Sequence, residues 1–214
     1  MHPVLTRLFD ELDRSTRPLP LGELRRRLKS LRLDRSMFAR AVRFGRSCYR
    51  RNLLHSGPAY QALVLCWRSG QRSPIHDHRG SACALRVIEG VATEIIFEIS
   101  PSGSLYPTST EHVDAGSVRA SWDLDIHQMG NLQAAGHDLI TFHIYSPPLL
   151  AMGTYFLGNS VLGEDDRAIS ALIRQRTRDK IAPRGLSVGQ EVRWATAGPL
   201  LRRGAHSRRR QTRA

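Results

Sequence analysis

From residue 61 to residue 145 the chain consists of short segments rich in β-branched and aromatic residues, and this pattern limits its fold more than any other feature. Gly, Pro, Ser and Asp residues lie between the segments, which are 61–68, 83–90, 92–99, 116–122 and 138–145. Short strands separated by turn residues at close spacing are typical of antiparallel barrels and jelly rolls. The sequence therefore predicts a mainly β fold, built as a jelly-roll β-barrel.

The segments on either side of these strands have helical patterns. Apolar residues recur at helical spacing between Val4 and Leu12, prolines interrupt the pattern, and 21–33 reads as a second helix. Asp34 is placed to cap a third, short helix, and 165–180 predicts another beyond the strands. We expect an N-terminal helical segment that packs on the barrel (1–45), the barrel domain (46–163), a partly helical C-terminal extension (164–197) and a basic tail (198–214).

The basic tail accounts for much of the formal net charge of +13. Its sequence, GPLLRRGAHSRRRQTRA, is rich in arginine and contains no acidic residue. We interpret it as a solvated, disordered terminus. An electrostatic contact with nucleic acid or an acidic partner is the alternative, but the tail has neither a nucleic-acid-binding motif nor interleaved aromatic residues. We therefore expect no nucleic-acid partner.

Cysteine content and hydropathy indicate the cellular compartment in which the protein is expected. The three cysteines include no CxxC pair, which argues against a disulfide framework and against a zinc ribbon. No apolar run approaches the length of a membrane span, and the N-terminus lacks the apolar core and cleavage site of a signal peptide. We expect a cytoplasmic monomer with no membrane association.

Of the nine histidines, His76 and His78 stand out because a single residue separates them. On a strand, residues i and i+2 point to the same face, so both imidazoles can converge on one metal ion. His127 comes about fifty residues later and is expected to complete the site from another strand. We interpret His55, His112, His137 and His206 as surface residues.

The residues around this pair match the first cupin motif in spacing. The motif positions are Gly70, His76, His78, Cys83 and Gly90. Cys83 stands where most cupins carry a glutamate ligand, and the second motif survives only as His127 and Asn131. Three neutral histidines leave the charge of a divalent metal uncompensated and leave coordination positions open. Such a site favours a thiolate ligand and suits oxygen chemistry on Fe(II), although these ligands also accept Zn, Mn, Ni or Cu.

A longer run of residues resembles the cysteine dioxygenase family. The matching segments are YRRNLLHSGPAYQALVLCWRSGQRSPIHDHRGSAC, IHQMGN and FHIYSPP. The resemblance is best from about Cys48 to Phe156 and implies a cupin barrel that oxidises L-cysteine with O2 to cysteine sulfinic acid, in cysteine catabolism. It implies Fe(II) as cofactor, held by His76, His78 and His127.

The resemblance also implies roles for residues around the metal. Arg51 would pair with the substrate carboxylate, a task suited to a guanidinium fork, and Tyr49 would assist. Cys83 and Tyr145 match two residues that many members join through a thioether crosslink. Thr141, His143 and Tyr145 match a hydrogen-bonded row, and the resemblance implies that His143, Tyr145 and Cys83 are catalytic. The further matches are Trp67, in the barrel, and Ser146–Pro147, a cis peptide.

Several alternatives to cysteine oxidation stay open at this point. Another small thiol acid, mercaptosuccinate or 3-mercaptopropionate, is the nearest; relatives that prefer 3-mercaptopropionate tend to carry glutamine at the position of Arg51. A non-enzymatic, metal-binding cupin regulator is the second alternative. A zinc-containing cupin isomerase or lyase is the third, and the missing glutamate ligand argues against it.

Overall fold

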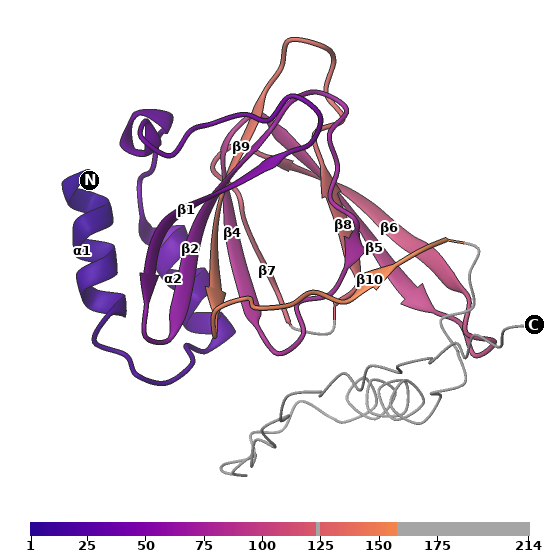
Figure 1. Ribbon diagram of the computed structural model, residues 1–214, viewed down its shortest axis with the longest axis horizontal. Helices are drawn as coiled ribbons and strands as arrows, with labels where there is room; N and C mark the ends of the chain where they lie inside the picture. The colour runs from indigo at the N-terminus through magenta and orange to yellow at the C-terminus, as the bar shows by residue number, and fades with distance from the viewer. Residues whose placement is uncertain (123–124, 158–214) are drawn as a thin grey trace, which may run out of the picture. The chain divides into compact units, whose positions relative to one another are not determined.

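The computed structural model describes residues 1–122 and 125–157. These residues form two five-stranded antiparallel sheets, with strand orders β1-β2-β9-β4-β7 and β10-β3-β8-β5-β6. The elements are α1 (Pro3–Leu12), α2 (Leu21–Ser30), the 3-10 helix Arg35–Phe38, β1 (Arg50–Gly57), β2 (Tyr60–Trp67), β3 (Ile75–His76), β4 (Ala82–Glu89), β5 (Val91–Ile99), β6 (Leu105–Asp114), β7 (Val118–Ser121), β8 (His127–Gly130), β9 (Leu139–Ser146) and β10 (Thr154–Tyr155). Figure 1 shows the two sheets facing each other, as in a jelly roll. The predicted mainly β fold is confirmed.

The inner strands of the first sheet, β2, β9 and β4, are buried on both faces, and they therefore read as nearly continuous apolar runs. One hydrophobic cluster lies between this sheet and the helices, and a second lies inside the barrel. Alternate side chains of β2 serve the two clusters: Ala62, Val64 and Cys66 pack under the helices, and Leu63, Leu65 and Trp67 line the interior. The same alternation on β9 directs Thr141, His143 and Tyr145 away from the helices, and Tyr145 belongs to the interior cluster.

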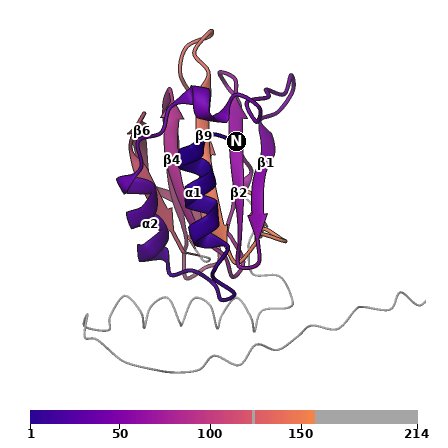
Figure 2. The same cartoon turned by 90° about the vertical axis from the view of Figure 1, so that its left-hand side faces the viewer.

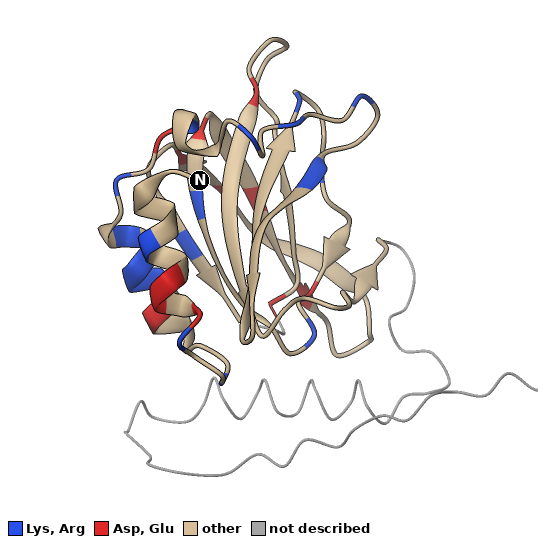
Figure 3. Cartoon of the chain, turned by 60° about the vertical axis from the view of Figure 1, so that its left-hand side comes forward, with Lys and Arg blue, Asp and Glu red and all other residues tan. Residues whose placement is uncertain are grey.

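The helices α1 and α2 cover the outer face of this sheet (Figure 2). The buried stripe of α1 is Leu5, Leu8, Phe9 and Leu12, which has the spacing of one helical face. Charged residues are concentrated on the helices and loops, whereas most of the barrel is uncharged (Figure 3). None of the helices among the described residues is long and apolar enough to cross a membrane.

Two long strands and one histidine differ from the sequence-based expectation. Strands β1 and β6 were not predicted, because both are largely polar and lie at the outer edges of their sheets. His55 is only partly exposed, because its ring stacks on Phe9 and its Nε2 lies 3.0 Å from a carboxylate oxygen of Asp13. His112 and His137 are exposed as expected.

The short third helix begins after Asp34, whose side chain accepts a hydrogen bond from the Ser36 N–H, so the predicted cap is confirmed. The predicted helix at 165–180, the basic tail and His206 lie outside the described residues.

Candidate metal centre

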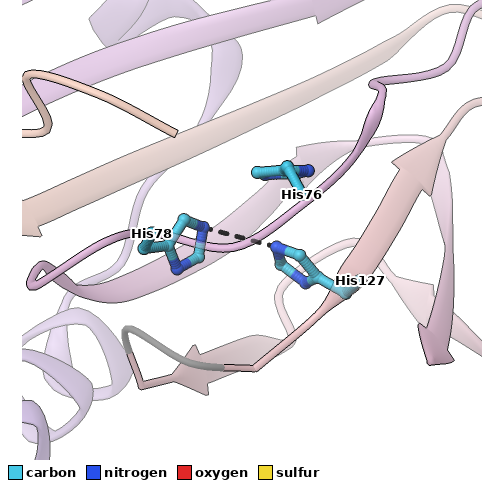
Figure 4. Close-up of side chains that lie close together, drawn as sticks. All are labelled: His76, His78 and His127. Atoms are coloured by element: carbon cyan, nitrogen blue, oxygen red, sulfur yellow. Dashed lines mark hydrogen bonds between the residues drawn. The ribbon is translucent and has the colours of Figure 1, made fainter. Parts of the chain in front are cut away.

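Three histidine side chains converge inside the barrel. His76 ends β3, His78 follows it by two residues, and His127 begins β8, where it is the cross-strand partner of His76. One ring nitrogen from each lies within 4.8 Å of the others, and all three residues are buried (Figure 4). Pairing of β3 with β8 therefore brings together the predicted ligands from two distant parts of the sequence.

The hydrogen bonds behind the rings prepare two of these histidines to bind a cation. Nδ1 of His76 lies 3.0 Å from the carbonyl oxygen of Pro74, and Nδ1 of His127 lies 2.8 Å from Oε1 of Glu94. Both partners are acceptors, so each Nδ1 carries the proton and each Nε2 presents a lone pair. The Nε2 atoms of His78 and His127 face each other at 3.3 Å, an arrangement that a cation between them stabilises.

Burial keeps the imidazoles of His76 and His78 neutral, which is the form that binds metals. Burial, followed by the nearby His127, lowers the pKa of His76 to about 4. The same causes in the same order lower the pKa of His78 to about 2, and its Nδ1 is buried with no hydrogen-bond partner. A divalent metal ion fits this donor set, because three buried imidazoles that converge on one point are ligands that such ions bind.

The histidines open onto a narrow cavity. It offers about 20 Å³ to the centre of a water molecule, room for about one water. The predicted metal ligands, substrate-binding residues and catalytic residues all line it. Besides the histidines His76, His78 and His127, the lining is Tyr49, Arg51, Leu65, Trp67, Ser73, Cys83, Leu85, Met129, His143 and Tyr145. A ligand in this cavity must be small.

Arg51 brings a positive charge to the cavity from β1. Its guanidinium lies 5.6 Å from the centre of the Tyr145 ring, and Nη1 lies 3.3 Å from the sulfur of Met152. No carboxylate in the described part of the chain forms an ion pair with it. Tyr49 stacks on Trp67 with the ring centres 4.1 Å apart. An unpaired guanidinium beside a cavity attracts an anionic group.

Strand β9 lines the cavity with a row of hydrogen-bonded side chains. Trp67 Nε1–H donates to Thr141 Oγ1 at 3.1 Å, and His143 Nε2 lies 2.8 Å from the same oxygen. The Tyr145 hydroxyl lies 3.2 Å from His143 Nδ1. Burial lowers the pKa of His143 and raises the pKa of Tyr145. The row therefore holds a neutral imidazole beside a protonated phenol.

Cys83 faces the end of this row from β4. It is the cross-strand partner of Tyr145, and its sulfur lies 3.8 Å from His143 Nδ1. Burial raises the pKa of the Cys83 thiol. The backbone thus places Cys83 and Tyr145 side by side, as the resemblance implied, and the bond between Ser146 and Pro147 is cis.

The segment after β9, residues 147–156, which we call the strap, crosses back to the metal ligands. Asp77, between His76 and His78, accepts hydrogen bonds from the Gly153 N–H at 2.8 Å and from the Tyr155 hydroxyl at 2.5 Å. A Cβ atom at position 153 would lie 2.6 Å from the Asp77 carboxylate, so only glycine fits there. Asp77 therefore fixes the strap, which carries Met152 against Arg51.

The sequence did not single out Glu94, Asp77 or Met152. Glu94 lies 33 residues from His127 along the chain, and Asp77 lies 76 residues from Gly153. The spacing of residues within a short motif does not reveal contacts between residues so far apart in the chain. The one available signal was the position of Asp77 between two predicted ligands.

An antiparallel jelly-roll barrel with three histidines converging in its interior defines a metal-binding cupin. A family model described as cysteine dioxygenase type I matches residues 22–156. The chain therefore belongs to the cysteine dioxygenase type I family.

Relatives of known name agree with this assignment. Cysteine dioxygenase type 1 of Danio rerio is 25% identical over 138 residues, which are 62% of this chain and 68% of that protein. The human protein of the same name is 28% identical over 119 residues, 54% of this chain and 59% of that protein. The chain thus spans between about three fifths and two thirds of the length of these relatives.

Solved structures that are similar to this one include a protein with a double-stranded β-helix domain from Klebsiella pneumoniae and a protein of Bacillus halodurans. The first has a TM-score of 0.45 and 16% identity, and covers 54% of this chain and 86% of its own. The second has a TM-score of 0.45 and 18% identity, and covers 58% of this chain and 86% of its own.

Proposed function

We propose that this protein is an Fe(II)-dependent thiol dioxygenase that oxidises L-cysteine with O2 to cysteine sulfinic acid. The observation that carries the proposal is one cavity in which three buried, converging imidazoles meet an arginine with no acidic partner among the described residues. A small molecule with both a thiol and a carboxylate matches this pair of features. Membership of the cysteine dioxygenase type I family supports the same reaction.

His76, His78 and His127 would hold the metal in this scheme. Fe(II) bound there supplies the redox chemistry that lets O2 react with a thiol. Both oxygen atoms are added to the sulfur, which is oxidised as O2 is reduced, so the reaction requires no external electron donor. The thiol proton ends on the sulfinic acid or on the solvent.

The remaining residues of the cavity orient the substrate. Arg51 would bind the carboxylate through its guanidinium, and Tyr49, held against Trp67, would contact the same group. Tyr145 would donate its hydroxyl proton as a hydrogen bond to the reacting oxygen, with His143 holding that hydroxyl in place. Fixing both ends of the substrate converts an encounter into an oriented reaction, worth up to about 7–11 kcal/mol in favourable cases.

The charge of the cavity lining favours a substrate with one carboxylate. Cysteine places its thiol and carboxylate within a few bonds of each other, whereas mercaptosuccinate carries a second carboxylate that requires additional space and charge. Arg51 has no second arginine or lysine beside it in the lining of the cavity. This single positive charge favours cysteine over the dicarboxylate.

Oxygen uptake by the Fe(II)-loaded protein tests the proposal. L-Cysteine, mercaptosuccinate and 3-mercaptopropionate should be compared, and the sulfur product identified by mass spectrometry. We expect uptake and sulfinic acid with L-cysteine, and no uptake by His76→Ala. Uptake only with one of the other thiols would replace the substrate but keep the chemistry. If none of the three thiols supports oxygen uptake, the dioxygenase function is contradicted and a non-enzymatic cupin is favoured.

A further inference from the structure

Glu94 is a buried acidic residue whose carboxylate reaches a ligand of the candidate metal centre. It lies in the middle of β5 and is 7% exposed. Its cross-strand partner on β8 is Met129, which packs inside the barrel, so the Glu94 side chain points to the same interior. Burying a carboxylate costs free energy unless it meets a cation or strong hydrogen-bond donors. The buried carboxylate of Glu94 therefore requires a cation or a hydrogen-bond donor beside it.

The first partner of Glu94 is His127. Oε1 lies 2.8 Å from Nδ1 of His127, and both side chains are almost completely buried. Because the carboxylate accepts only, it fixes the proton on Nδ1 and turns Nε2 toward His78 and His76. The hydrogen bond also increases the electron density that Nε2 offers to a cation.

The second partner of Glu94 comes from the opposite sheet. Nε of Arg119, on β7, lies 4.0 Å from Oε2 of Glu94, and the same guanidinium contacts Glu111 on β6. Glu94 and Glu111 are themselves cross-strand partners. Arg119 thus lies between two carboxylates, of which only Glu94 reaches a histidine of the metal centre.

The buried acids of the described chain divide between two tasks. Asp77 and Glu94 are the buried carboxylates of residues 1–122 and 125–157. Both oxygens of Asp77 accept hydrogen bonds from the strap. Glu94 is the one whose oxygen meets a histidine ring. Of these two buried carboxylates, Glu94 is therefore the one that reaches a candidate metal ligand through a hydrogen bond.

We propose that Glu94 is a positioning residue of the metal centre: it orients His127 and supplies, one hydrogen bond behind the ligand, a negative charge that stabilises the bound divalent metal. The inference rests on the proposed metal centre and assigns a task to a residue outside it. It requires no particular substrate. Arg119 acts on Glu94 in turn, as a positive charge 4.0 Å from its second oxygen.

Metal affinity separates this role from a structural one. Fe(II) binding should be measured without oxygen by competition with a coloured chelator, for the full chain and for Glu94→Gln and Glu94→Ala. We expect the dissociation constant to rise roughly 10–100-fold in Glu94→Ala. Glutamine keeps an acceptor for His127 but loses the charge, so Glu94→Gln should fall between the wild type and Glu94→Ala.

Glu111→Gln is the matched control. Glu111 lies opposite Glu94 on the neighbouring strand and contacts the same arginine, so the substitution removes one negative charge from the same surroundings. Its Fe(II) affinity should equal that of the wild type. Thermal unfolding of the metal-free proteins reports on folding, and Glu94→Gln, which keeps the shape of the side chain, should unfold as the wild type does.

Wild-type affinity in a folded Glu94→Gln and a folded Glu94→Ala would overturn the inference, and so would an equal loss in Glu111→Gln. A wild-type protein that binds no Fe(II) would overturn it as well. Because the measurement involves no thiol and no O2, a protein that binds Fe(II) through Glu94-supported histidines but oxidises no thiol would sustain this inference while contradicting the proposed function.

Discussion

At the scale of single residues, Arg51 is the proposed partner of the substrate carboxylate. Its side chain lines the cavity and forms no ion pair within the described chain. The Arg51→Gln variant removes a charge-assisted hydrogen bond, worth about 1.5–3 kcal/mol. We therefore expect kcat/KM for L-cysteine to fall roughly 10–100-fold, mainly through KM. Steady-state oxygen uptake measures both constants.

Two comparisons make the Arg51 prediction specific. Arg50→Gln changes the neighbouring, exposed arginine and should leave the kinetics unchanged. Cysteamine, which has the thiol and amine but no carboxylate, should react equally with wild type and Arg51→Gln. If Arg51→Gln lowers kcat/KM for cysteamine as much as it does for cysteine, the role assigned to Arg51 is contradicted.

At the scale of elements, the N-terminal helices belong to the barrel fold. Leu24 of α2 is fully buried in the cluster under the first sheet. Leu24→Ala leaves a cavity in that cluster and should lower the free energy of unfolding by about 2–5 kcal/mol. Urea unfolding measures the difference. Arg26→Ala, on the exposed face of the same helix, should change it by no more than about 0.5 kcal/mol.

The strap is the second element whose attachment can be tested. The Tyr155 hydroxyl donates to the buried carboxylate of Asp77. Tyr155→Phe removes that bond without altering a metal ligand, so hydrogen exchange in residues 149–156 should become faster. Tyr106→Phe, on an exposed strand, is the control. Unchanged exchange in Tyr155→Phe would show that the strap is held by other contacts.

The elements also show how much the sequence could predict. Strands buried on both faces, such as β2 and β9, have apolar runs that were recognised, whereas the polar edge strands β1 and β6 were not. The spacing of the first motif predicted that His76 and His78 would share one site. The carboxylates that support this site were missed, because Glu94 and Asp77 contact residues far away in the chain.

At the scale of the whole molecule, metal binding and folding are coupled. The three histidines come from β3, the loop after it and β8, so the site exists only in the folded barrel. A metal that binds only the folded state stabilises it by about 2.7 kcal/mol when its concentration is 100 times Kd. We expect Fe(II) added without oxygen to raise the Tm, and a chelator to reverse the rise.

The coupling has a clear negative control. His127→Ala removes one ligand and should abolish the rise in Tm. An equal rise in His127→Ala would place the metal elsewhere and contradict the assignment of the site.

In the proposed function, this barrel adds both atoms of O2 to the sulfur of cysteine. The most direct measurement is the mass of the product formed by the Fe(II)-loaded protein from L-cysteine under ¹⁸O2 in unlabelled water. The proposed function predicts cysteine sulfinic acid in which both added oxygen atoms are ¹⁸O. A product with one or no labelled oxygen, formed under conditions where sulfinate does not exchange with water, would contradict it.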